Sequence, residues 1–365
     1  MTLPEWVISA SYILVLLLAF ALTLLLVPMT RWLSFKLGAV SRPGGRRRES
    51  IPMPKLGGIA LFIAFTVTVL VAQWLPVERL DPNEVTRLTG LLLGGAVIFI
   101  VGLIDDFYEL SYIAQAAGQI LAAGIAIAFQ IFIEYFNNPF TGQQTPEWGM
   151  PVTIVLTLFW MGLMMNTVNF LDGADGLAAG VCGIAGVLLF LNGAFFVEPA
   201  QSSVSLLHLA LVGICAGFVV YNFYPAQIYL GGGALYLGYL VGTLSIIGGA
   251  KMATILLVMG LPLMDLAWQA ANRLRQGRSP FSGDRGHLHF RLLDSGLMTP
   301  RQLALGYYAF CAFFGMLTLV LESQLYKFVA FSVMLMLVAI GFSLVARFKA
   351  AQSSGEEAYS SSSSE

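Results

Sequence analysis

Long apolar runs recur along the whole chain and constrain its fold more than any other feature. A helix needs about 20 apolar residues to cross the hydrocarbon core of a bilayer. Hydrophobic residues make up 58% of the 365 residues and charged residues only 11%, which would leave a water-soluble domain with a large exposed apolar surface. We therefore expect an all-α integral membrane protein with about eleven transmembrane helices, at residues 6–28, 56–75, 88–104, 112–133, 151–168, 177–197, 206–223, 234–249, 252–271, 303–321 and 328–346.

Lysine and arginine fall mostly on one side of these predicted spans. Segments 31–55 and 273–301, together with the C-terminal tail, hold 15 of the 19 basic residues. The loops on the other side hold Arg79, Arg87, Lys251 and Lys327. Because cytoplasmic loops are enriched in lysine and arginine, we expect the N-terminus outside and the C-terminus in the cytoplasm. The net charge of −1 provides no basic field, so no nucleic-acid partner is expected.

The predicted spans form one polytopic membrane domain over residues 1–350. The last segment, 351–365, is polar and rich in serine, a composition typical of disordered tails. The three cysteines lie inside apolar runs and lack the spacing of metal ligands. We interpret them as packing residues.

Two adjacent carboxylates, Asp105 and Asp106, end the third predicted span. Like charges placed side by side at a membrane surface repel each other, and a cation or basic group between them would relieve the repulsion. Taken alone, the pair is explained equally well by solvation of a helix end.

A second polar cluster ends the fifth predicted span. Asn166, Asn169, Asp172 and Asp175 follow one another at intervals of three residues, which keeps neighbouring members near one face of a helix. Asparagine and aspartate are costly at this depth without a partner, which favours a ligand over a simple helix cap. Their oxygens would suit a hard cation such as Mg²⁺ or would hydrogen-bond a nucleobase, and both interpretations stay open.

A third cluster lies between the ninth and tenth predicted spans and contains Asp284, Arg285, His287, His289 and Arg291. The planar guanidinium groups suit phosphate oxygens. An ordinary positive-inside loop would explain the arginines alone. The two histidines, on the same predicted side as the four aspartates above, favour phosphate binding.

Several strings resemble the polyprenyl-phosphate N-acetylhexosamine-1-phosphate transferases (glycosyltransferase family 4). They are PKLGG at 54–58, GLIDD at 102–106, NTVNFLDGADGLAAG at 166–180, NFYPAQIYLG at 222–231 and DRGHLHFRLL at 284–293. The resemblance implies an enzyme that moves a sugar-1-phosphate from a UDP-sugar to a membrane polyprenyl phosphate and releases UMP. It also implies a multi-pass protein of the inner (plasma) membrane, a cytoplasmic active site and a first membrane step in a cell-envelope glycan pathway.

The resemblance assigns roles to residues of all three clusters. It implies that an acidic pair lies next to the lipid phosphate, that another acid and amide lie near the diphosphate and metal, and that one acid binds uracil. Catalytic roles fall to Asp105, Asp106, Asp172 and His287; substrate-binding roles fall to Asn166, Asn169, Asp175 (the uracil position), Lys55, Asp284, Arg285, His289 and Arg291. The implied cofactor is Mg²⁺, with Mn²⁺ as an alternative, held by Asn169 and Asp172.

The implied partners are a UDP-N-acetylhexosamine and a polyprenyl phosphate. The segment 284–291, with its arginine at 291, looks more like the GlcNAc-type branch than like the branch with a muramoyl-pentapeptide donor, so UDP-GlcNAc is preferred. The bacterial branch suggests undecaprenyl phosphate as the lipid. A homodimer is left open.

One departure from the family pattern concerns the metal. The resemblance implies an aspartate ligand directly after Gly231, but the chain continues with Gly232, and both flanks align only if that aspartate is missing. Ile113 and Gln115 also stand where the family often has basic residues, and Phe290 where it often has histidine. A catalytically impaired homologue that binds lipid or nucleotide is therefore the alternative to an active transferase. A transporter is disfavoured, because the polar residues gather at one face rather than at the midplane.

Overall fold

A computed structural model of the protein describes residues 5–41, 52–249, 251–278 and 286–362. Apart from one short antiparallel strand pair, in which Val40 faces Pro54, its regular elements are helices. In chain order they are α1 (Glu5–Leu37), β1 (Val40–Ser41), β2 (Met53–Pro54), α2 (Gly57–Ala72), α3 (Glu84–Tyr108), α4 (Tyr112–Ala128), α5 (Met150–Leu171), α6 (Leu177–Phe195), α7 (Ser202–Asn222), α8 (Gly233–Ile247), α9 (Met252–Val258), α10 (Gly260–Arg275), α11 (Leu288–Asp294), α12 (Pro300–Val320) and α13 (Gln324–Ser362).

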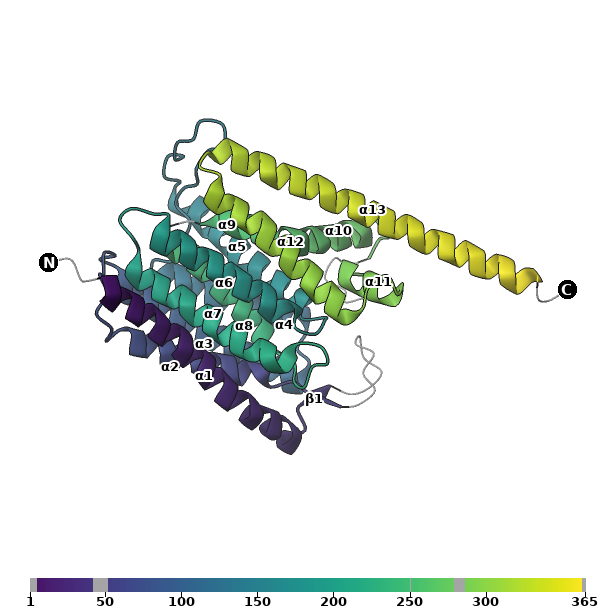
Figure 1. Ribbon diagram of the computed structural model, residues 1–365, viewed down its shortest axis with the longest axis horizontal. Coiled ribbons are helices and arrows are strands. Elements are labelled where there is room, and N and C mark those ends of the chain that lie inside the picture. Colours follow the sequence, from purple (N-terminus) through teal and green to yellow (C-terminus); the bar gives the residue numbers. More distant parts are fainter. Residues whose placement is uncertain (1–4, 42–51, 250, 279–285, 363–365) are drawn as a thin grey trace.

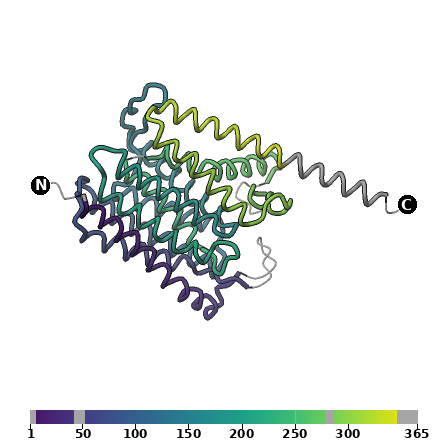
Figure 2. The backbone as a smooth tube through the Cα atoms, in the orientation of Figure 1, coloured from purple at the N-terminus to yellow at the C-terminus, as the bar shows by residue number. Residues whose placement is uncertain are grey.

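Most of the long helices run alongside one another and form a bundle (Figure 1). The strand pair and α11 lie at the end of the bundle remote from the N-terminus, as the tube in Figure 2 also shows. Helix α8 is the centre of the bundle, because all of its 15 residues are buried and it packs against α2, α3, α5 and α6. The segment that leads into α8 is therefore held from several sides.

The helices fit an all-α membrane protein. Seven of those described are long and apolar enough to cross a bilayer, or eight if the bent pair α9–α10 counts as one span. Helices α2, α4 and α8 are apolar but shorter; the 15 residues of α8 rise only about 22 Å at 1.5 Å per residue. Each predicted apolar segment contains a helix, while the number of eleven crossings stays a prediction.

The prediction of one continuous helix over residues 252–271 is wrong. The structure has two helices there, α9 and α10, bent by 72°. Pro262 explains the break, because proline has no N–H to donate to the carbonyl of Val258 and its ring crowds that turn. Gly260 adds to it: a Cβ at this position would lie 1.9 Å from the Met334 side chain, so α13 packs directly against the bend.

Helix α13 continues well beyond its apolar part. Its membrane-span candidate ends at Val345, but the helical backbone runs on to Ser362. The structure therefore gives a helical backbone to most of the segment 351–365, for which the composition predicts disorder. No comparison tests that expectation, which stays a prediction.

Candidate functional site

The candidate site lies where α3 and α5 end and α8 begins. Asp105 and Asp106 occupy the last turn of α3, and Asp172 directly follows α5. Three consecutive glycines, Gly231–Gly233, lead into α8. The sequence therefore places its acidic clusters on two helix ends that converge beside the start of the buried central helix.

The three glycines allow this close approach of backbones. A Cβ on Gly232 would lie 2.1 Å from the carbonyl carbon and oxygen of Gly102 in α3, and a Cβ on Gly233 would lie 2.4 Å from Cα of Gly58 in α2. Gly231 has a φ of +58°, a left-handed conformation that favours glycine. Only residues without a side chain let α8 start in this position.

The same glycines bring a main-chain donor to an acidic side chain. The N–H of Gly232 donates to Asp106 Oδ2 at 3.0 Å. A Cβ on Gly231 would lie 2.5 Å from Asp106 Oδ1 and 2.1 Å from the carbonyl oxygen of Lys55. The backbone at Gly231 thus fills the space between Asp106 and Lys55.

Lys55 reaches the site because its segment pairs with the chain before α8. Tyr229 N–H donates to the Pro54 carbonyl at 2.8 Å, and Gly57 N–H donates to the Tyr229 carbonyl at 3.1 Å. Lys55, Asp105 and Asp172 all act electrostatically on the Asp106 carboxylate. Four of the predicted site residues, from three separate segments, are therefore close together.

Asp105 is held by the turn after α3 and by the first turn of α4. Its Oδ1 accepts hydrogen bonds from Leu110 N–H at 2.8 Å and from Gln115 Nε2 at 2.9 Å. Gln115 stands where the family resemblance leads us to expect a basic residue. The neutral amide orients the carboxylate but brings no positive charge to the site.

The segment after Asp172 is fixed by side chains of α7 and α12 and by one main-chain donor. Asp175 Oδ2 accepts from Ala226 N–H at 3.0 Å. The buried Asn222 accepts from Gly176 N–H at 3.0 Å and donates to the Ile228 carbonyl at 2.8 Å. Tyr308 donates its hydroxyl hydrogen to the Gly176 carbonyl at 2.6 Å. Asn222 thus ties this segment to the 223–228 segment, a role that no local pattern indicates.

The two predicted amides differ in their surroundings. Asn166 Nδ2 donates to Gln119 Oε1 and to the Gly162 carbonyl, both at 2.7 Å. Asn169, one turn later, is half-buried at the end of α5. The amide pair between Asn166 and Gln119 joins α4 to α5, while the substrate contacts of both asparagines stay predictions.

The histidine segment is anchored by an aspartate on α10. His287 Nδ1 lies 3.2 Å from Asp265 Oδ2, and Leu288 N–H donates to Asp265 Oδ1 at 2.9 Å. His289 Nδ1 lies 3.7 Å from the same Oδ2. Asp265 was not predicted, because it lies 22 residues from His287; the available signal was a carboxylate within an apolar run.

The histidines pack directly on the segment that carries Asp172. The His287 ring lies 4.9 Å from the Phe170 ring and is stacked on His289 at 5.6 Å. A Cβ on Gly173 would lie 2.5 Å from His289 Nε2. A side chain at position 173 would therefore collide with His289.

The two nitrogens of His287 have different surroundings. A carboxylate accepts hydrogen bonds only, so the contact with Asp265 assigns the hydrogen of a neutral His287 ring to Nδ1. The other nitrogen, Nε2, is buried and has no hydrogen-bond partner among the residues that the structure describes. A buried polar atom of this kind is ordinarily satisfied, so Nε2 is a candidate contact for a substrate.

Two arginines of this segment were predicted to bind substrate. Arg291 donates from Nε to the Gly286 carbonyl at 2.6 Å, and Gln269 donates to the same carbonyl. Arg291 therefore stabilises the start of the segment as well as supplying a cation. Asp284 and Arg285 lie outside the described residues.

The described acids do not form a full set of metal ligands. In residues 5–41, 52–249, 251–278 and 286–362, no three side chains from His, Cys, Asp and Glu are grouped as metal ligands. Asp106 and Asp172 do act on each other electrostatically, a like-charge arrangement that a bound cation would relieve. Such a pair fits an ion like Mg²⁺, which often takes one or two carboxylates and completes its shell with water and substrate phosphates.

Comparisons with known proteins point in one direction. The profile of glycosyl transferase family 4 matches residues 88–249. The chain is 31% identical over 309 residues to a probable undecaprenyl-phosphate N-acetylglucosaminyl 1-phosphate transferase of Bacillus subtilis, covering 82% of each protein. It is 34% identical over 294 residues to a decaprenyl-phosphate N-acetylglucosaminephosphotransferase of Mycobacterium tuberculosis, covering 73% of this chain and 72% of that protein.

A more distant relative has a similar name. The chain is 27% identical over 302 residues to the undecaprenyl-phosphate alpha-N-acetylglucosaminyl 1-phosphate transferase of Escherichia coli K12, covering 78% of this chain and 76% of that protein. All three alignments extend well beyond the segment that the family profile matches.

Proposed function

Because this chain belongs to glycosyl transferase family 4, we propose that it transfers N-acetylglucosamine-1-phosphate from a UDP-sugar to a membrane polyprenyl phosphate and releases UMP. The observation that carries this proposal is the meeting of Lys55, Asp106 and Asp172 at one end of the bundle. His287 packs beside them on Phe170. Acids, a cation and an imidazole are thus available where two phosphorylated substrates would meet.

The proposed reaction brings two anionic phosphates together in line. An oxygen of the lipid phosphate forms a bond to the sugar-bearing phosphorus, and the bond from that phosphorus to the bridging oxygen breaks, so that UMP leaves with the electron pair. Catalysis then depends mainly on positioning and charge neutralisation. Lys55 and Arg291 would neutralise phosphate oxygens, and His287 Nε2, the ring nitrogen without a hydrogen, would accept a hydrogen bond from a donor group of the substrate.

Asp105 is proposed to orient the acceptor rather than deprotonate it. A phosphate monoester has a second pKa near 6, so the lipid phosphate is largely dianionic at neutral pH. The two hydrogen bonds to Asp105 Oδ1 hold the carboxylate in one position. If Asp105→Asn left transfer intact, the role of Asp105 as a base would be excluded.

We propose Mg²⁺ as the cofactor, with Mn²⁺ as an alternative. Asp106, Asp172 and the amide oxygen of Asn169 would hold it, as the fit of the like-charged pair supports. When bound, the ion would neutralise charge on the diphosphate. Transfer activity should then be lost with a chelator and return with added Mg²⁺.

The proposed topology follows the basic residues. Eleven crossings, an extracytoplasmic N-terminus and a site on the cytoplasmic side of the inner membrane agree with the positive-inside rule. Reporter fusions after Gln130 and after Gln276 test this arrangement. The first position should report the outside and the second the cytoplasm, and the reverse result would overturn the proposal.

A catalytically impaired homologue is the second candidate function. The observation in its favour is that Gly231 and Gly232 stand where the family resemblance implies an acid, and that no three-ligand group is found in the described part of the chain. Such a protein would bind lipid or nucleotide without turnover.

One assay separates the two candidates. Sugar-phosphate transfer from labelled UDP-GlcNAc to undecaprenyl phosphate is measured for this chain, for a variant with Asp inserted after Gly231 and for a matched variant with Ala inserted there. Transfer by the unmodified chain supports the active enzyme. Transfer only with inserted Asp identifies an impaired homologue, and no transfer by any of the three overturns the transferase proposal.

A further inference from the structure

A cavity of about 440 Å³ lies at the other end of the bundle. Its walls come from the N-terminal half of α5, from α9, from the start of α13 and from the loop between α4 and α5. Helix α5 ends at Leu171 beside the candidate site, so the cavity and the site lie toward opposite ends of this helix. The volume is within the range of about 300–1,000 Å³ that is usual for ligand sites.

The cavity has an ordered roof. In the loop between α4 and α5, Trp148 N–H donates to the Glu134 carbonyl at 3.2 Å, and the rings of Phe136 and Trp148 lie 5.2 Å apart. The Phe140 ring lies 5.6 Å from Phe328 of α13. Main-chain hydrogen bonds and aromatic contacts therefore hold the loop against the first turns of α13, which makes the cavity preformed.

One cation lines this largely apolar cavity. Lys327 lines it together with aromatic and aliphatic residues and with the polar residues Asn137 and Gln324. Among the described residues it forms neither an ion pair nor a hydrogen bond through its side chain. A partly buried ammonium without an anion is unfavourable, and an anionic ligand would correct this.

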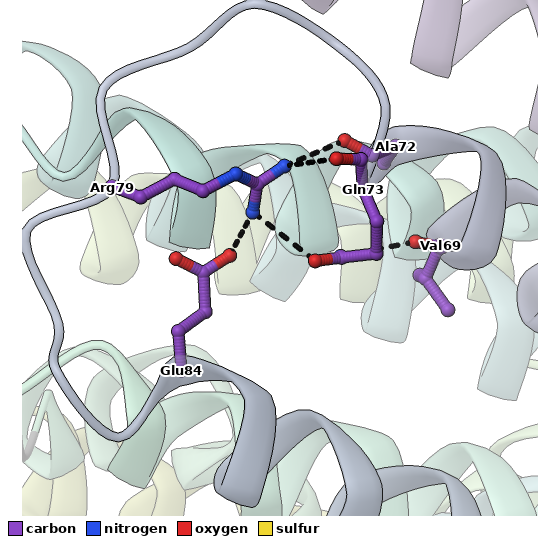
Figure 3. A network of polar contacts seen from close by, with 5 residues as sticks. All are labelled: Val69, Ala72, Gln73, Arg79 and Glu84. Carbon is purple, nitrogen blue, oxygen red and sulfur yellow. Dashed lines mark hydrogen bonds and ion pairs between the residues drawn. The ribbon is translucent and has the colours of Figure 1, made fainter.

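The other basic residues on this side of the protein are already partnered. Arg79 binds Glu84, Gln73 and the carbonyl of Ala72 (Figure 3). Arg87 pairs with Asp81 at 2.8 Å. Lys251 donates to Gln201 at 3.0 Å. Lys327 is therefore the basic residue in this group whose side chain has no partner among the described residues.

We propose that the cavity binds an anionic phospholipid, with an acyl chain against the aromatic walls and the phosphate on Lys327. The charge match at Lys327 selects an anionic head group, since a lysine near a membrane surface attracts anionic lipids. The apolar walls select a lipid over a soluble anion. Outward-facing apolar side chains of the same helices, such as Val155 and Val329, are exposed and leave the cavity next to the bilayer.

This proposal is tested by native mass spectrometry of the full chain in detergent. The protein is titrated with dioleoylphosphatidylglycerol and with the zwitterionic dioleoylphosphatidylcholine. The variant Lys327→Met removes the charge and keeps the aliphatic stem. The matched control is Lys36→Met. Lys36 lies over the Trp32 ring in the last turn of α1. Thermal melting of each variant confirms folding.

We expect phosphatidylglycerol to bind more tightly than phosphatidylcholine. Lys327→Met should weaken phosphatidylglycerol binding about five-fold, equivalent to about 1 kcal/mol, and Lys36→Met less than two-fold. Equal binding of the two lipids, or equal effects of the two variants, would overturn the proposal. Displacement of phosphatidylglycerol by inorganic phosphate would assign the site to a soluble anion, and displacement by equimolar undecaprenyl phosphate would assign it to the substrate; either result also overturns the proposal.

Discussion

Replacing Asp265 by asparagine changes the contacts of Oδ2 with His287 and His289 and little else. Asparagine has nearly the same volume, and its carbonyl oxygen can still accept from Leu288 N–H, as Oδ1 does at 2.9 Å. Its amide group would replace Oδ2, which lies 3.2 Å from His287 Nδ1. An amide donates where the carboxylate accepts, so His287 must either lose this contact or move its hydrogen to Nε2.

The expected magnitude follows from this contact. A hydrogen bond to a charged group contributes about 1.5–3 kcal/mol, and each 1.4 kcal/mol corresponds to a factor of ten. If the orientation and tautomer of His287 are needed in the transition state, kcat for sugar-phosphate transfer should fall about 10- to 150-fold. KM for the UDP-sugar should change much less, because the remaining phosphate-binding side chains are intact.

The assay is the initial rate of transfer from UDP-GlcNAc to undecaprenyl phosphate in detergent. Asp81→Asn is the matched control, since Asp81 pairs with Arg87 at the opposite end of α3. Nitrogen-15 chemical shifts of His287 report its tautomer independently of activity. A kcat for Asp265→Asn within three-fold of the Asp81→Asn value would refute the reasoning, as would an unchanged His287 tautomer alongside a large loss of rate.

Three further predictions concern stability, each measured as a change in thermal unfolding in detergent. Gly232→Ala should destabilise the protein by about 3 kcal/mol or more, because a methyl group would collide with the Gly102 carbonyl and displace the N–H that donates to Asp106. Gly306→Ala is the control, since its Cβ would meet nothing within 4 Å. Equal destabilisation by the two substitutions would contradict the packing argument. Asn222→Ala should cost about 2–5 kcal/mol, because it leaves a buried N–H and a buried carbonyl unsatisfied; a loss below 1 kcal/mol would mean that water replaces both bonds. Burial lowers the pKa of Lys251 from 10.5 to about 8. Between these pH values the unfolded chain binds one more proton than the folded chain, so the free energy of unfolding should rise with pH, by at most about 3 kcal/mol. Lys251→Met should lack this rise, and the same pH profile in the variant would exclude Lys251 as its cause.

The positions of the helices could be predicted from the sequence far better than the bends within them. Runs of apolar residues predict helices because the bilayer leaves no other way to satisfy the backbone. The bend of 72° between α9 and α10 was missed, although Pro262 was a visible signal. A mean hydropathy over a window of residues does not detect the loss of one backbone N–H, such as that of Pro262.

The candidate site could be predicted only in part. Asp105, Asp106 and Asp172 stand out as polar residues at the ends of apolar runs, and His287 stands out in a cluster of histidines and arginines between two runs. Their supports do not: Asp265 lies in a helix 22 residues before its histidine, and Gln119 pairs with a residue 47 positions away. Such partners have no fixed spacing, so a pattern read along the chain cannot pair them.

The sequence by itself determined that the helices lie in a membrane, that the fold is all-α, and at which end of the bundle the polar groups gather. All three follow from transfer free energies summed over many residues, which do not depend on contact geometry. Only the tertiary structure decided which groups meet there. Hydrogen bonds near 3 Å and backbones that touch through Gly102 and Gly232 require positions accurate to a fraction of an ångström, and those positions arise from the packing of α3, α5 and α8 together.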